Sequence, residues 1–191
     1  MAVEPHPLGF FLPEGTRLLM LGSFPPPKQR WSMNFYYPNF QNDMWRILGL
    51  IFFYDKDFFV DTPHAFSEAK AKAFCQDKKI GIGDTAMSVI RLRGNASDEF
   101  LQVVEPIHLA EVLSQIHDCQ ALVVTGGKAT ETLLMQLPGI KSPQVGSSVP
   151  FELLDRSFRL YRMPSSSRAY PMSLITKAEA YKHMFDELKM L

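Results

Sequence analysis

The apolar run Ala121-Leu122-Val123-Val124-Thr125 restricts the possible folds of this chain more than any other segment. A strand with apolar side chains on both faces needs cover on both faces, which is typical of a parallel sheet between two layers of helices. Gly126-Gly127 then leads into a predicted helix at 130–136. The run from Arg17 to Leu21, which ends at Gly22, predicts a second buried strand. Together these segments predict an α/β fold.

Strand and helix patterns alternate along the rest of the chain. The alternation predicts one domain over residues 1–191, a three-layer α/β/α sandwich around a central, largely parallel sheet of four to five strands. The position of Pro106 suits a helix start, and Thr176 and Glu179 have the spacing of a capping box at the start of the last helix. The other predicted elements are strands at 80–82, 151–154 and 158–161, and helices at 44–48 and 67–78.

Four loops leave predicted strands at the same end of the sheet. They lie at Gly22, Asp84, Gly126 and Met163. In open α/β sheets, ligands bind at the carboxyl ends of the strands. We therefore expect these loops to converge on one cleft.

The composition narrows the class of protein further. An apolar content of 46%, a charged content of 21% and 191 residues suit a globular domain with a full-sized core. No apolar run approaches the roughly 20 residues of a membrane span, and the N-terminal segment has no basic region of a signal peptide. Cys75 and Cys119 are too few for a four-cysteine metal site and suit buried thiols in a reducing compartment, so we expect a cytoplasmic protein.

Four segments carry residues that suit nucleic-acid chemistry. Gly22-Ser23-Phe24-Pro25 follows the first strand, Tyr36-Tyr37-Pro38 lies about a dozen residues later, and Asn42-Asp43-Met44-Trp45 opens a helix. Near the end of the chain, Met163-Pro164-Ser165-Ser166-Ser167-Arg168-Ala169 follows another strand. Serine hydroxyls and backbone N–H groups suit phosphate oxygens, and an arginine can enter a base stack.

In this order the segments resemble the motifs of the uracil-DNA glycosylase superfamily, most closely its thymine-DNA and mismatch-specific uracil-DNA glycosylase branches. The resemblance covers nearly the whole chain. It implies a DNA glycosylase that flips a damaged nucleotide out of DNA and hydrolyses its N-glycosidic bond. It also implies that DNA is the partner, that no metal or other cofactor takes part, and that the protein acts as a monomer. The net charge of zero does not oppose this, since counterion release depends on cations placed near phosphates.

One position separates this chain from those two branches. Their first loop reads Gly-x-Asn-Pro-Gly, with the Asn holding the attacking water, and this chain has Phe24 there. The Gly-Ser-Phe-Pro form is similar to the hypoxanthine-DNA glycosylase branch, whose catalytic Asn lies in the Asn-x-x-Trp segment. The resemblance therefore implies Asn42 as the catalytic residue and a deaminated base, hypoxanthine or uracil, as the target. Pro38-Asn39-Phe40 and Asp43 depart from that branch, which usually has Gly-His-Pro and a basic residue.

The same comparison implies roles for two further sets of residues. The thymine-type loop reads Met-Pro-Ser-Ser-Ser-Ala-Arg, and its Arg enters the gap left by the flipped nucleotide, a wedge role that would pass to Arg168 one residue earlier. The expected base pocket comprises Gly22, Ser23, Phe24, Tyr36, Tyr37 and Asp84. The expected DNA-binding residues are Pro164, Ser165, Ser166, Ser167, Arg168 and Lys128.

Each of these residue types also has an ordinary structural use. Asn42 suits a helix N-cap, Asp84 suits an Asx-turn, and aromatic side chains are common in cores. Gly126-Gly127-Lys128 lacks the glycine spacing of a Walker motif, so Lys128 also suits a solvated position in a strand-to-helix turn. A different class of function is open on the same fold, namely a non-catalytic protein that binds nucleic acid or a nucleobase.

Overall fold

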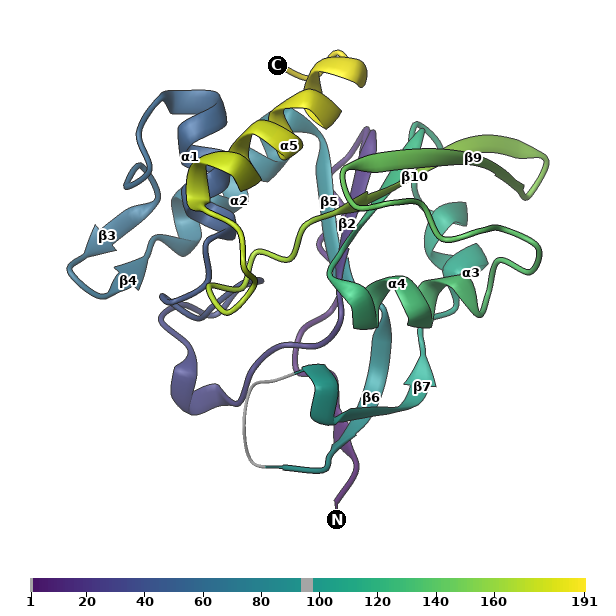
Figure 1. Cartoon of the computed structure of the whole chain (residues 1–191), viewed down its shortest axis with the longest axis horizontal. Coiled ribbons are helices and arrows are strands. Elements are labelled where there is room, and N and C mark those ends of the chain that lie inside the picture. Colours follow the sequence, from purple (N-terminus) through teal and green to yellow (C-terminus); the bar gives the residue numbers. More distant parts are fainter. Residues whose placement is uncertain (1, 94–97) are drawn as a thin grey trace.

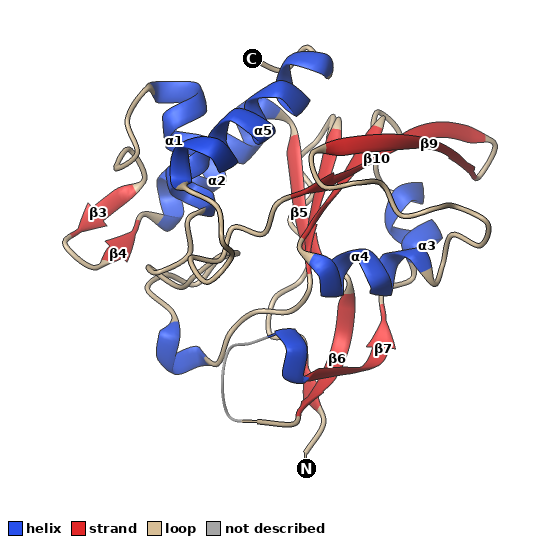
Figure 2. Ribbon diagram, in the orientation of Figure 1, coloured by secondary structure: helices blue, strands red, loops and turns tan. Residues whose placement is uncertain are grey.

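The computed structural model describes residues 2–93 and 98–191 of the chain. Its centre is a five-stranded sheet with the order β5-β2-β8-β10-β9, and helices cover both faces (Figures 1 and 2). The first four of these strands are parallel, and β9 pairs antiparallel with β10 at one edge. The predicted α/β/α fold with a largely parallel sheet is therefore confirmed. The strands are β5 (Ile80–Asp84), β2 (Leu18–Gly22), β8 (Ala121–Thr125), β10 (Arg156–Met163) and β9 (Ser147–Leu153).

Side chains of each central strand alternate between two cores. In β2, Leu18 and Met20 belong to one core, whereas Leu19 and Leu21 belong to the other. This follows from the two-residue period of a strand, and it explains why the central strands are apolar throughout. The first core is covered by α1 (Met44–Phe53), α2 (Glu68–Lys78) and α5 (Leu174–Glu187), and the second by α3 (Leu109–Ser114) and α4 (Gly127–Leu134) (Figure 1).

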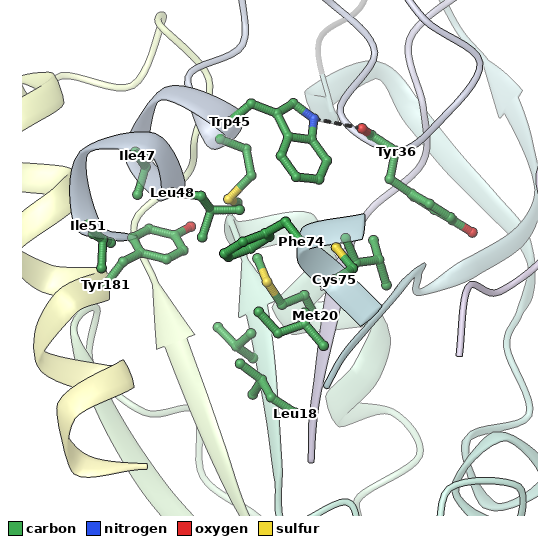
Figure 3. Close-up of a cluster of buried hydrophobic side chains, with 14 of the residues drawn as sticks. Leu18, Met20, Tyr36, Trp45, Ile47, Leu48, Ile51, Phe74, Cys75 and Tyr181 are labelled. Atoms are coloured by element: carbon green, nitrogen blue, oxygen red, sulfur yellow. Dashed lines mark hydrogen bonds between the residues drawn. The ribbon is translucent and has the colours of Figure 1, made fainter. Parts of the chain in front are cut away.

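The first core also fixes the loop before α1. Trp45 is fully buried among side chains from β2, α2 and α5, and its indole N–H donates to the carbonyl oxygen of Tyr36 at 3.0 Å (Figure 3). A buried indole nitrogen usually needs such a partner. The tryptophan of the Asn-x-x-Trp segment therefore anchors the Tyr36-Tyr37 loop to the core.

Two predicted helix starts are wrong. Pro106 is the last residue of β7 (Leu101–Pro106), and the next helix begins only at Leu109. Because β7 is an edge strand, a proline without an N–H is tolerated there. The last helix begins at Leu174 and is capped by Ser173, whose hydroxyl accepts from the N–H of Thr176 at 3.1 Å. Because the helix is already capped at Ser173, the predicted capping box with Thr176 as its N-cap does not form.

A second, smaller sheet lies beside the main one. It has the order β1-β6-β7, with β1 (Glu4–Pro5) and β6 (Ala86–Arg91) antiparallel. A hairpin of β3 (Val60–Thr62) and β4 (Ala65–Phe66) makes a third unit. Short 3₁₀ helices cover Lys28–Arg30 and Asp98–Phe100. In the described part of the chain, no helix has the length and apolar character needed to cross a bilayer.

A buried ion pair joins α5 to the start of α1. Lys177 is 1% exposed, and its Nζ lies 3.4 Å from Oδ2 of Asp43 and 2.7 Å from the carbonyl oxygen of Ser167. The backbone N–H of Asp43 donates to the carbonyl oxygen of Ser166 at 2.9 Å, and Asn42 forms a β-bridge with Ser167. These contacts hold the serine-rich loop, 163–169, against the Asn42-Asp43 segment.

We expect Lys177→Met to destabilise the protein by about 3 kcal/mol, because it leaves the buried carboxylate of Asp43 with only one cationic partner. Urea unfolding measures the change. Lys182→Met is the matched control, since Lys182 is exposed on the same helix. Replacing Asp43 by Asn in the Lys177→Met background should restore part of the lost stability. Wild-type stability in Lys177→Met would show that the pair does not hold the loop.

Candidate active site

A cavity of about 660 Å³ opens at the carboxyl ends of the parallel strands. This volume lies within the usual range for sites that bind small molecules. Two of the four expected loops, those at Gly22 and Asp84, line it directly, and the other two contribute their neighbours Thr125 and Ser165. The predicted sites that line the cavity are Gly22, Ser23, Phe24, Tyr36, Tyr37, Asn42, Asp84, Ser165, Ser166, Ser167 and Arg168.

Two predicted DNA-binding residues lie outside this lining. Pro164 is buried, and its carbonyl oxygen accepts from the hydroxyl of Tyr181 at 2.8 Å, so it anchors the serine-rich loop to α5. Lys128 lies in the first turn of α4, with its Nζ 3.8 Å from Oε2 of Glu131. The role of Lys128 in DNA binding remains a prediction.

Small residues and close packing define one wall of the cavity. A side chain on Gly22 would collide with the carboxylate of Asp84, so only glycine fits at the end of β2. Tyr37 has a left-handed backbone, with φ 51°, and its hydroxyl lies 3.2 Å from the hydroxyl of Thr125. This bond holds the ring of Tyr37, which lies in the loop before α1, at the end of β8. The wall therefore combines a carboxylate, hydroxyl groups and an aromatic face.

The two tyrosines of this wall are neutral. Burial raises the pKa of both Tyr36 and Tyr37, and the nearby charge of Asp84 raises each further. A neutral phenol can donate and accept hydrogen bonds, and its ring offers a stacking surface. Tyr36 uses its hydroxyl to donate to the carbonyl oxygen of Gly9 at 3.1 Å, which leaves its ring as the part available to a ligand.

Asn42 is not the N-cap of α1, which is Asp43, but its side chain still supports the start of that helix. It lines the cavity, and its side-chain oxygen accepts from the backbone N–H of Met44 at 2.9 Å, at the start of α1. A side-chain amide has two donor hydrogens and two acceptor lone pairs, and the bond to Met44 uses only one of these four. Arg46 donates to the backbone oxygen of Asn42 at 3.2 Å and to that of Phe40 at 2.8 Å, and these two bonds fix the backbone of residues 40–42 against α1.

Arg168 is partly committed within the protein. Its Nε donates to Oδ1 of Asp43 at 3.0 Å, and its Nη1 donates to Oε1 of Gln41 at 2.6 Å. The side chain is still 45% exposed, and a guanidinium has five N–H donors. Asp43 therefore lies between two cations, Arg168 and Lys177, which balance its negative charge.

Three residues in or next to the cavity are missing from the predicted site: Asp98, Glu99 and His6. Asp98 lines the cavity beside Glu99, and burial raises its pKa, opposed by a hydrogen bond from Ser23. His6 lies 2.8 Å from Asp84 through its Nε2. His6 had no local signal in the sequence, since it reaches Asp84 only through the pairing of β1 with β6. In the described residues, no group of three or more His, Cys, Asp or Glu side chains could hold a metal ion.

Lys177 could have been found from the sequence. It lies four residues before Tyr181 and seven before Met184, on the same apolar stripe of α5. A lysine on a buried stripe needs an anionic partner, which here is Asp43. Only the identity of that partner required the structure.

No protein-family model matches this sequence, and no curated protein matches it. Among solved structures, the fold is similar to the solution NMR structure of a "putative Uracil DNA glycosylase" from Methanosarcina acetivorans. The TM-score is 0.65 and the sequence identity is 20%, over 98% of this chain and 99% of that chain. At this identity the likeness establishes the fold, and it extends over the whole domain.

Proposed function

We propose that this protein is a DNA glycosylase that hydrolyses the N-glycosidic bond of a deaminated base, hypoxanthine or uracil, in base-excision repair. One observation carries the proposal. The first loop, the Asn42 segment and the serine-rich loop lie far apart in the sequence, yet all three line one cavity. The similar fold of the archaeal structure supports it. We also propose that the protein acts as a monomer in the cytoplasm.

The chemistry requires three things of such a cavity. The enzyme must receive a base that has been taken out of the stack, place a water at the sugar and stabilise the negative charge that grows on the departing base. Tyr36, Tyr37 and Phe24 supply aromatic surface on which a base can stack. The amide of Asn42 is the group that would orient the water, because Phe24 has no polar atom. Asp84 would face the base.

The serine-rich loop would act on the DNA backbone and on the stack. Ser165, Ser166 and Ser167 place hydroxyl and backbone groups at the mouth of the cavity, and Arg168 is exposed beside them. Backbone phosphates are commonly held by such groups. Arg30 lines the same cavity and adds a second exposed cation.

One observation favours a non-catalytic nucleobase-binding protein as a second candidate. The side-chain oxygen of Asn42 already accepts from Met44, and Phe24 leaves the first loop without an amide side chain that could hold the water. In that case the cavity would bind a base without cleaving its bond.

Oligonucleotides that carry a single uracil or hypoxanthine decide between the two functions. The purified protein is incubated with each, in single-stranded and duplex form, and abasic sites are then cleaved with alkali. Strand scission at the modified position supports the glycosylase. Binding to the modified oligonucleotides without scission supports the second candidate, and neither binding nor scission contradicts both.

We expect Asn42→Ala to lower the single-turnover rate of excision on the order of a hundredfold, because it removes the group that positions water. It should also cost about 1 kcal/mol of stability, since the bond to Met44 is lost. Asn42→Ser separates the two uses: its hydroxyl can still accept from the N–H of Met44 but does not supply the amide. Wild-type thermal stability with lost excision is the expected result for Asn42→Ser, and retained excision in either variant would contradict the catalytic role.

Arg168→Ala is expected to reduce excision from duplex DNA about tenfold and to leave excision from single strands nearly unchanged, because only a duplex has a stack to hold open. Parallel assays on the two forms of one oligonucleotide measure the difference. Arg159→Ala is the control, since Arg159 is exposed on β10 and binds Ser148 away from the cavity. Equal losses on both substrates would assign Arg168 a phosphate contact, and no loss would contradict any role in DNA binding.

A further inference from the structure

A buried histidine stands directly behind the cavity wall. Nε2 of His6 lies 2.8 Å from Oδ2 of Asp84, and the two side chains are only 5% and 8% exposed. Asp84 lines the cavity, whereas His6 is not among its lining residues. His6 can therefore influence a ligand only through the carboxyl group of Asp84.

Several contacts hold His6 in this position. Its backbone N–H donates to the carbonyl oxygen of Met87 at 2.7 Å, in the register of β1 with β6. Its ring packs edge-on against Phe24, with the centroids 5.1 Å apart. Nearby, Arg91 binds the carboxylate of Glu4 at 2.9 Å, which fastens the N-terminal arm, residues 2–9, to the small sheet.

The contacts of the ring fix its orientation toward Asp84. Nδ1 lies 2.6 Å from the carbonyl oxygen of Leu8, and it accepts from the Leu8 amide at 3.1 Å. These two contacts hold the ring so that Nε2 faces Oδ2 of Asp84 at 2.8 Å.

The position of the Asp84 carboxyl group matters for a departing base. Negative charge grows on the base as its glycosidic bond breaks, and a carboxylate at the same wall opposes it in a site of low dielectric. The charge of Asp84 acts on the cavity, because it raises the pKa of Tyr36, Tyr37 and Asp98. A hydrogen bond to His6 behind the wall determines which way this carboxyl group faces.

We propose that His6 is a positioning residue that fixes the carboxyl group of Asp84 from behind the cavity wall, through the contact between Nε2 and Oδ2, so that the carboxyl group keeps one orientation toward the departing base. The inference rests on the proposed glycosylase function. The N-terminal arm then has an indirect part in the site, because His6 does not line the cavity and acts through Asp84.

A double-mutant cycle tests the proposal. His6→Gln should lower the single-turnover excision rate about tenfold when Asp84 is present, and less than about threefold when Asp84 is already replaced by Asn, because the carboxylate that His6 positions is then absent. His183→Gln, on the exposed face of α5, is the histidine control. Thermal melting verifies that the variants fold. Equal losses in both backgrounds would reduce His6 to a structural contact and overturn the proposal.

Imidazole NMR gives a second test that does not depend on activity. In ¹⁵N-labelled protein, the Nε2 signal of His6 should shift when Asp84 is replaced by Asn, whereas the signals of the exposed His183 should not. An Nε2 signal that Asp84→Asn leaves unchanged would contradict the proposal even in an active enzyme. If the signal shifts and no modified oligonucleotide is cleaved, the glycosylase function fails while the contact between His6 and Asp84 stands.

Discussion

The carboxylate of Asp43 joins the segments that form the candidate site. It accepts from Lys177 of the last helix and from Arg168 of the serine-rich loop, while its backbone N–H donates to Ser166. Segments from the N-terminal and C-terminal parts of the chain thereby meet at the start of α1. Because burial of one unpaired charge is costly, each partner constrains the others, and the loop has one position relative to Asn42.

The same principle bears on how a chain of zero net charge could hold the polyanion that the proposed function requires. The carboxylate of Asp43 lies between two cations, Lys177 and Arg168, so it would repel phosphates little. Arg30 and Arg168 are exposed cations among the residues that line the cavity, and their local placement matters more for phosphates than the sum of charges over the chain.

The fold followed from the sequence because its central strands are apolar on both faces, a pattern with few structural solutions. The cavity residues of the first loop and of the Asn42 segment were found because short local motifs carry them. Local patterns failed where partners come from distant segments. Pro106 ended an edge strand, Ser173 displaced the capping box at Thr176, and His6 reached Asp84 through strand pairing that two residues of β1 establish.

Because β1 is short, the site can be disturbed while the rest of the fold stays intact. An arm held by two paired residues and a few side-chain contacts can open locally at a small fraction of the free energy of global unfolding. Each opening would carry His6 away from Asp84 while the sheet and both cores stay intact. The orientation of the Asp84 carboxyl group then fluctuates within the native state, and under the proposed function the fraction of time that the arm is docked would set the fraction of molecules ready to react.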